Sequence, residues 1–114
     1  MRRSGAAAKL GDTAPVFAAL GDPTRLRLVA RLSADGPLSI TRLSADADVT
    51  RQAVTKHLLA LESAGLARPH RQGREQIWEL ETRRLAQARQ ALDFISGQWD
   101  SAIARFKALV ESTP

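Results

Sequence analysis

The stretch TRQAVTKHLLALESAGL, residues 50 to 66, constrains the fold more than any other part of the chain. Thr50 is a favourable N-cap, because its hydroxyl can accept a hydrogen bond from a free backbone N–H of the first helical turn. Gly65 stands where helices commonly end on a left-handed residue. Apolar residues recur between these ends at helical spacing: Val54, Leu58 and Leu61. The pattern predicts one amphipathic helix with a clear start and a clear end.

The side of this helix opposite the apolar stripe carries side chains that suit DNA. An amide, a hydroxyl and an ammonium can hydrogen-bond to base edges and phosphates. The hypothesis is therefore a DNA recognition helix, and the alternative is an ordinary packing helix with a solvated polar side. His57 lies beside the apolar stripe, so we expect it to be half-buried and within reach of phosphate. The candidate DNA-binding residues on this helix are Arg51, Gln52, Thr55, Lys56 and His57.

Positive charge is concentrated in and after this helix. The chain has 114 residues and a net charge of +5. From Arg51 to Arg74 there are five basic residues and one acidic residue, which places four of those net charges within 24 residues. A concentrated basic patch is typical of a protein that binds a polyanion. Chance clustering on a solvated surface is the alternative.

Length and composition exclude several classes of protein. A chain of this length predicts one domain with a modest core. It has no cysteine, which excludes disulfides, zinc fingers and thiol catalysis. No apolar run approaches the roughly 18 residues of a membrane span, and the first residues lack the apolar stretch of a signal peptide, so a cytoplasmic protein without a membrane partner is expected. No carboxylate pair, catalytic triad or glycine-rich phosphate loop occurs, so we expect no catalytic residues and no enzyme activity.

The N-terminal part predicts an arm followed by a short helix. Residues 1–11 have the character of a flexible arm. A helix is expected to start near Thr13, because Pro15 is welcome in a first turn. It should end at Gly21.

A helix-turn-helix is predicted between Asp22 and the recognition helix. Asp22 followed by proline is a strong helix start, and Gly36 should end that helix. Arg25 in its first turn is expected to pair within the chain rather than with DNA. After a short extended piece, Ser39 can cap another short helix. About four residues join it to the helix at Thr50, which is the pattern of a helix-turn-helix.

After Gly65 the hydrophobic period changes from 3.6 to 2, which predicts two strands. Residues 66–70 and 76–80 are the candidates, joined by a turn at residues 72–74. Directly after a recognition helix, such a hairpin is interpreted as the wing of a winged helix, and a plain solvent-facing hairpin is the alternative. The candidate DNA-binding residues of the wing are Arg71, Gln72 and Arg74.

A last helix, capped by Thr82, should run to about Val110. Its apolar residues follow a heptad pattern over more than three heptads, which is typical of a helix that pairs with another helix. We expect this seam to form a homodimer, and packing along its own domain is the alternative. Gly97 is a weak point that predicts a bend or a break. The candidate dimer-interface residues are Phe17, Leu85, Leu92, Ile95, Trp99 and Phe106.

Together these elements predict a mainly α fold with a small β-hairpin. A winged helix-turn-helix core covers residues 12–81, and a dimerisation helix of the same domain covers residues 82–114.

Two segments, ALGDPTRLRLVARL and TRQAVTKHLLALESAGLARPHRQGREQIWEL, resemble the ArsR/SmtB-like family of winged-helix repressors. The likeness covers about residues 14–80, and the long closing helix also suits this family. It implies a homodimer that binds an inverted-repeat operator in double-stranded DNA and represses transcription. It also implies that Gln52, Thr55 and Lys56 face the major groove and that Arg71 and Arg74 reach a minor groove or phosphates.

Many members of that family sense metal ions, and this sequence departs from their pattern. The family's thiolate site lies near the segment that here reads SITRLSADA, which has no Cys, and the last helix has no His for the other site. Zinc favours these two ligands. We therefore expect the metal-independent branch, with no metal site and no cofactor, and the sequence leaves any small-molecule effector open. Two weaker hypotheses are a protein-interaction module that does not bind DNA and a ligand-binding or catalytic protein with a pocket near Trp78 or Trp99.

Overall fold

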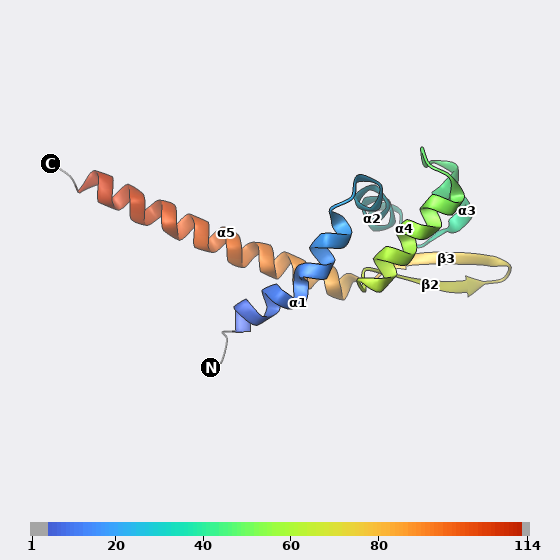
Figure 1. Ribbon diagram of the computed structural model, residues 1–114, viewed down its shortest axis with the longest axis horizontal. Coiled ribbons are helices and arrows are strands. Elements are labelled where there is room, and N and C mark those ends of the chain that lie inside the picture. Colours follow the sequence, from blue (N-terminus) through green and yellow to red (C-terminus); the bar gives the residue numbers. More distant parts are fainter. Residues whose placement is uncertain (1–4, 113–114) are drawn as a thin grey trace.

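The computed structural model describes residues 5–112 of the chain. Helices and a small sheet gather at one end of the molecule, and one long helix extends from them as a rod (Figure 1). The elements follow in the order α1 (Gly5–Leu20), α2 (Pro23–Asp35), β1 (Leu38–Ser39), α3 (Ile40–Ala45), α4 (Arg51–Ser63), β2 (Ala67–Gln72), β3 (Glu75–Leu80) and α5 (Thr82–Glu111). This architecture confirms the predicted fold class, a winged helix-turn-helix with a long C-terminal helix.

The first helix starts earlier than predicted. Helix α1 begins at Gly5 and not near Thr13. The predicted start near Thr13 is therefore wrong, since residues 5–11 of the expected arm are the first turns of α1, and residues 1–4 lie outside the described residues. Three consecutive alanines at positions 6–8 favour a helix, since alanine has the highest helix propensity. Packing of α1 along α5 adds the tertiary support that a helix of this length needs.

Helix α2 starts and ends where local chemistry predicts. Asp22 is its N-cap, and its Oδ1 accepts from the backbone N–H of Thr24 at 2.9 Å and of Arg25 at 3.1 Å. Gly36 closes the helix with a φ of 77°, and its N–H donates to the carbonyl oxygen of Leu32. Both predicted boundaries are confirmed.

The helix-turn-helix is also confirmed. Oγ of Ser39 accepts from the N–H of Arg42 and caps α3, and Oγ1 of Thr50 accepts from the N–H of Ala53 and caps α4, both at 3.1 Å. Gly65 follows α4 with a φ of 76°. The apolar stripe of α4 is fully buried in the core, with its residues Val54, Leu58 and Leu61 each 0% exposed.

The wing belongs to a sheet with one more strand than the sequence predicted. The strand order is β1-β3-β2, and both pairings are antiparallel. The extended piece before α3 is strand β1, which pairs with β3. The wing turn is also tighter than expected, because Gln72 is still paired with Glu75 and only Gly73 and Arg74 form the turn. Gly73 has a φ of 64° and Arg74 a negative φ, which fits a type II′ turn with glycine first.

Trp78 and Ile77 are both buried, although they point to opposite faces of β3. Simple alternation predicts only one buried face. Strand β3 is the middle strand of the sheet, helices α2 and α3 pack on it, and residues on both of its faces are buried at this point. Trp78 is only 1% exposed and contributes the largest fully buried side chain of the core.

Helix α5 is continuous through Gly97. Its N-cap is Glu81, which makes no side-chain capping hydrogen bond, and Thr82 is the first helical residue, so the predicted cap at Thr82 is wrong. Only its first turns pack on the core, where Ala88 and Ala91 are buried. At about 1.5 Å per residue the helix is about 45 Å long, so most of it extends beyond the core. Within the described chain, no helix is both long and apolar enough to cross a bilayer.

Candidate nucleic-acid interface

The outward side of α4 presents most of the predicted recognition residues together. Arg51, Gln52 and Lys56 are exposed on its first two turns. Thr55 is half-buried, and its Oγ1 donates to the carbonyl oxygen of Arg51 at 3.0 Å. The hydroxyl hydrogen is therefore used within the helix, and the oxygen lone pairs remain as acceptors. This face can donate to base edges through an amide and an ammonium and can accept through a hydroxyl.

Leu59 lies on the same outward side, and 48% of its area is exposed. A leucine here contributes little to the core, whereas an apolar side chain in a major groove can contact a thymine methyl group. The prediction of DNA contacts overlooked it because only polar residues were considered. Its position on the helical wheel, beside Gln52 and away from the buried stripe, is the signal that could have identified it.

His57 lies on the inner flank of α4 and faces the start of α2. Its Nδ1 is 3.4 Å from Nη1 of Arg25 and 3.9 Å from Oδ1 of Asp22. Arg25 also donates from Nε to the carbonyl oxygen of Ala19 at 2.6 Å, so its predicted pairing within the chain is confirmed. His57 is thus tied to α2 and does not project outward with Gln52.

The carboxylate of Asp22 is ionised in this cluster. The hydrogen bond from the backbone N–H of Arg25 is the largest cause and lowers the pKa of Asp22 below the ordinary value. Burial opposes it, and the backbone N–H of Thr24 and the nearby His57 and Arg25 side chains each add a smaller lowering effect. Hydrogen bonds and positive charges that favour the ionised form explain the direction. The cap of α2 is therefore anionic near neutral pH.

The wing presents a second cationic surface. The side chains of Arg71, Gln72 and Arg74 are exposed around Gly73 at the tip, and in the part of the chain that the structure describes none of the three forms a hydrogen bond or an ion pair. Arg68 differs, because it pairs with Glu79 at 3.0 Å and with Glu81 at 3.4 Å. The basic patch is therefore narrower than the sequence count suggested, since the charge of Arg68 is compensated within the hairpin.

Helix α4 and the wing occupy the same end of the long axis of the molecule, whereas α5 extends toward the opposite end (Figure 1). Arg51 and Lys56 on α4 and Arg71 and Arg74 on the wing are exposed at this end, and within the described residues none of these four side chains has an ion-pair partner. The polar side of α4 and the wing tip are therefore candidates for one shared polyanion-binding surface.

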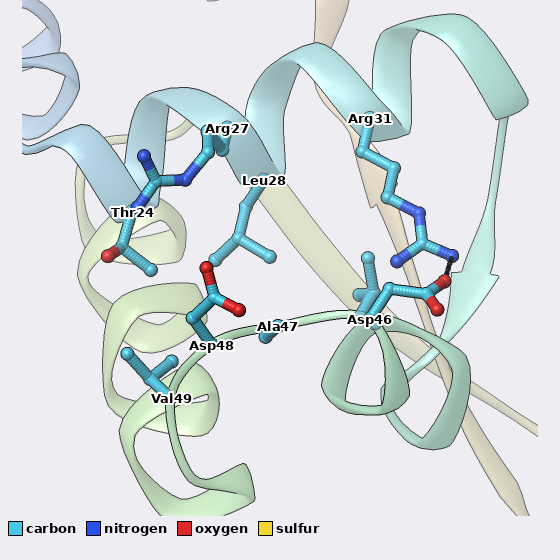
Figure 2. A pocket seen from close by; sticks show the side chains of 9 residues that line it. Thr24, Arg27, Leu28, Arg31, Asp46, Ala47, Asp48 and Val49 are labelled. Atoms are coloured by element: carbon cyan, nitrogen blue, oxygen red, sulfur yellow. Dashed lines mark ion pairs between the residues drawn. The ribbon is translucent and has the colours of Figure 1, made fainter.

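A cavity of about 130 Å³ lies between α2 and the connection from α3 to α4 (Figure 2). Arg31 borders it, with Nη2 2.6 Å from Oδ2 of Asp46 and Nη1 donating to the carbonyl oxygen of Arg42. This guanidinium ties α2 to the turn of the helix-turn-helix. Neither tryptophan lines this cavity, since Trp78 is buried in the core and Trp99 is exposed on α5.

Four of the six predicted interface residues lie on an apolar face of α5 that no part of the described chain covers. Trp99 and Phe106 are 66% and 68% exposed, and Leu92 and Ile95 are about half exposed. The other two have a different place, because Phe17 and Leu85 are partly buried against the core of their own chain. We define the α5 face as the exposed apolar residues Leu92, Ile95, Trp99, Ile103, Phe106, Leu109 and Val110.

No group of three or more histidine, aspartate or glutamate side chains within residues 5–112 is arranged to hold a metal ion. The sequence offers no cysteine as a further ligand.

Known proteins resemble this chain over most of its length. The helix-turn-helix domain family matches residues 20–70. The HTH-type transcriptional regulator Rv2034 of Mycobacterium tuberculosis is 36% identical over 94 residues, which cover 82% of this chain and 84% of that protein. The uncharacterized HTH-type transcriptional regulator YuzN of Bacillus subtilis is 37% identical over 73 residues, which cover 59% and 79%. A solved structure of an ArsR-like transcriptional regulator from Rhodococcus sp. RHA1 matches with a TM-score of 0.77 and 33% identity, covering 93% of this chain and 99% of that one.

Proposed function

The chain belongs to the ArsR-like family of winged helix-turn-helix transcriptional regulators, which bind DNA, and from this premise we propose that it is a homodimeric repressor of an inverted-repeat operator. One observation carries the proposal: the exposed polar side of α4 and the arginines of the wing share one end of the molecule, and the uncovered α5 face lies toward the other (Figure 1). The first surface suits DNA, and the second suits another copy of the chain.

In the proposed complex, α4 enters the major groove. The Gln52 amide pairs with adenine and the Lys56 ammonium with guanine, and each contact discriminates against a wrong base by roughly 1–3 kcal/mol. Arg51 and the lone pairs of Thr55 lie at the edge of the same surface, where they contact phosphate or an adjacent base. His57 approaches the backbone from the inner flank of the helix.

The wing supplies contacts that do not depend on sequence. Arg71, Gln72 and Arg74 reach phosphates or a flanking minor groove from the hairpin tip. Each neutralised phosphate releases counterions, so the affinity should fall steeply as salt rises. The absence of internal partners for Arg71 and Arg74 within the described residues supports this role, since both charges are available.

Two copies associate through their α5 faces. Leu92, Ile95, Trp99 and Phe106 form the centre of the interface, and Phe17 and Leu85 support α5 from within each protomer. Water cannot solvate such a row of large apolar side chains favourably, and burying each one contributes about 1.5–3 kcal/mol. The two α4 helices then enter successive major grooves about 34–36 Å apart, which requires an operator with two-fold symmetry.

We propose that this regulator acts without a metal ion or another cofactor. The chain has no cysteine, and α5 has no histidine, so the preferred zinc ligands are missing from both positions at which relatives would bind the ion. We propose that it works in the cytoplasm, where the bacterial regulators that it resembles would meet DNA.

Selection of bound sites from random duplexes tests the proposal most directly. We expect enriched sites to be inverted repeats with half-sites one helical turn apart, and light scattering on the same sample to report a dimer. The matched control is Gln52→Ala in the same selection, which should enrich sites of lower information content at one position of each half-site. Enrichment of no sequence by a dimer, or of single half-sites by a monomer, would contradict the proposal.

A further inference from the structure

Arg25 joins three helices at the inner flank of α4. It lies in the first turn of α2, and its Nε donates to the carbonyl oxygen of Ala19 in α1 at 2.6 Å. Its Nη1 lies 3.4 Å from Nδ1 of His57 in α4. The guanidinium is held by α1 on one side and meets the recognition helix on the other, so α1 fixes its position relative to His57.

The chemistry of these groups decides which nitrogen of His57 carries the hydrogen. A guanidinium can only donate hydrogen bonds, so Nδ1 of a neutral His57 must accept and the ring hydrogen must be on Nε2. The competing neighbour is Asp22, whose Oδ1 lies 3.9 Å from Nδ1, beyond hydrogen-bond distance. That oxygen already accepts from two backbone N–H groups of α2. Arg25 therefore controls the tautomer.

Nε2 of His57 is not sealed in the core and has no partner within the described residues. The side chain is half-buried, with 23% of its area exposed. In residues 5–112, only Oγ of Ser44 and Nε1 of Trp78 are buried polar side-chain atoms without a hydrogen-bond partner. Nε2 of His57 is therefore not a fully buried atom that lacks a partner. No hydrogen bond to Nε2 occurs within that range either. An N–H at this atom is therefore available to an outside acceptor.

We propose that Arg25 is a positioning residue for DNA binding: it holds His57 in the Nε2–H tautomer, and this N–H donates to a phosphate oxygen of the duplex. The inference rests on the proposed function, because a phosphate must reach α4. Lys56, the preceding residue, is exposed and supplies a cation beside this N–H. A neutral N–H held by the protein adds a directed contact, which fixes the register of a recognition helix without reading the sequence.

The first test needs no DNA. The chain has two histidines, so correlation of imidazole ¹⁵N and ¹H signals in the full chain, with His70→Gln for assignment, identifies the His57 tautomer. We expect Nε2–H under conditions in which the ring is neutral. Arg25→Met removes the donor and keeps an unbranched side chain, which leaves Asp22 as the polar neighbour of Nδ1. The Nδ1–H form should then increase.

Either of two results in this experiment would overturn the assignment to Arg25. One is an Nδ1–H tautomer in the wild type. The other is an unchanged Nε2–H population in a folded Arg25→Met variant, with folding checked by thermal unfolding.

The second test measures binding of a random-sequence duplex in dilute salt. His57→Asn places an amide near the position of Nδ1, where it can still accept from Arg25, and it leaves nothing at the position of Nε2. His57→Gln places an amide N–H near the position of Nε2. We expect the Asn variant to bind about tenfold more weakly, as for loss of one hydrogen bond to a charged group, and the Gln variant to recover most of that loss.

The controls separate this inference from the proposed function. His70→Gln makes the same change on β2 and controls for the loss of a histidine. If His57→Asn binds as tightly as the wild type, the phosphate contact is wrong while DNA binding stands. If the wild type itself fails to bind any duplex, the proposed function and the phosphate contact both fail, and the tautomer experiment shows separately whether Arg25 controls the ring.

Discussion

Leu38 of β1 is the register partner of Trp78 of β3, so the short strand that leads into the helix-turn-helix pairs with a strand of the wing hairpin. On its other edge Trp78 pairs with Pro69 of β2. The backbone of Trp78 thus lies in the middle strand, between β1, which leads into α3, and the outer strand of the hairpin. This strand joins the wing and the helix-turn-helix in one sheet.

Trp78→Ala should destabilise the protein by about 3–5 kcal/mol, because it leaves a large cavity in the core. Trp78→Phe should cost less than about 1.5 kcal/mol, since it keeps an aromatic ring and removes a buried Nε1–H that has no hydrogen-bond partner. Urea unfolding followed by far-ultraviolet circular dichroism measures both values. Equal losses in the two variants would show that the indole N–H has a partner such as a buried water.

Asp22 should make stability depend on pH in the acidic range. Its pKa is lower in the folded protein, chiefly because of the Arg25 backbone N–H, so its contribution is fully present above the ordinary carboxyl pKa. That contribution is lost as pH falls through the folded value. Urea unfolding of the wild type and Asp22→Asn should therefore show an advantage of the wild type near neutral pH that shrinks in acid. The Asn variant is a fair control because asparagine also caps helices but does not titrate; a constant difference between the two proteins would exclude this linkage.

Arg74→Ala should weaken binding to all duplexes about equally and reduce the slope of log affinity against log salt by about 1. Arg68→Ala is the matched control on the same hairpin. It should change the slope less, because Arg68 is already paired with Glu79 and Glu81. Titrations of one duplex at several salt concentrations measure both slopes, and equal changes would mean that the internal ion pairs of Arg68 do not withhold its charge from DNA.

Trp99→Glu should weaken dimerisation by at least about 100-fold, because it places a charge in the centre of the α5 face. The fold of the protomer should be kept, since 66% of the Trp99 side chain is exposed. Ser101→Glu adds the same charge on the opposite side of α5 and should leave the dimer intact. Sedimentation velocity over a concentration series distinguishes the two variants. A Trp99→Glu protein that remains dimeric would place the interface elsewhere.

Replacing Gly97 and Gly65 by alanine should change the stability of the protein in opposite directions. Gly97→Ala should stabilise α5 by about 1 kcal/mol, because alanine favours a helix and its Cβ would meet nothing within 4 Å. Gly65→Ala should destabilise the protein, because the backbone has a φ of 76° and the added Cβ would lie 3.1 Å from Nε of Arg84. Thermal unfolding of both variants at one protein concentration gives the comparison. Stabilisation by Gly65→Ala would mean that the helix end can rearrange.

The boundaries that the sequence predicted correctly are those decided by nearby atoms. Asp22, Ser39 and Thr50 each cap a helix by accepting from an N–H two or three residues later, and Gly36 and Gly65 end helices through their own φ. Such interactions span at most about one helical turn, so the order of residues is enough to identify them. The cap predicted at Thr82 is the exception, because Thr82 is itself the first helical residue of α5 and its N-cap is Glu81, which makes no side-chain capping hydrogen bond.

Contacts between distant segments depend on the tertiary structure. The pairing of Leu38 with Trp78 joins residues 40 positions apart, and no local pattern marks a strand of two residues as the partner of the wing. The contacts of His57 also could not be predicted from local patterns. Its residue type and its position on the helix suggested only a DNA contact. Only the packing of α2 against α4 brings Arg25 and Asp22 to its Nδ1. The sequence by itself determined which helices form and which of their sides are apolar or basic, because both follow from short-range spacing. The folded chain decided which of these side chains stay free for DNA or a second copy, because that depends on which neighbours they meet.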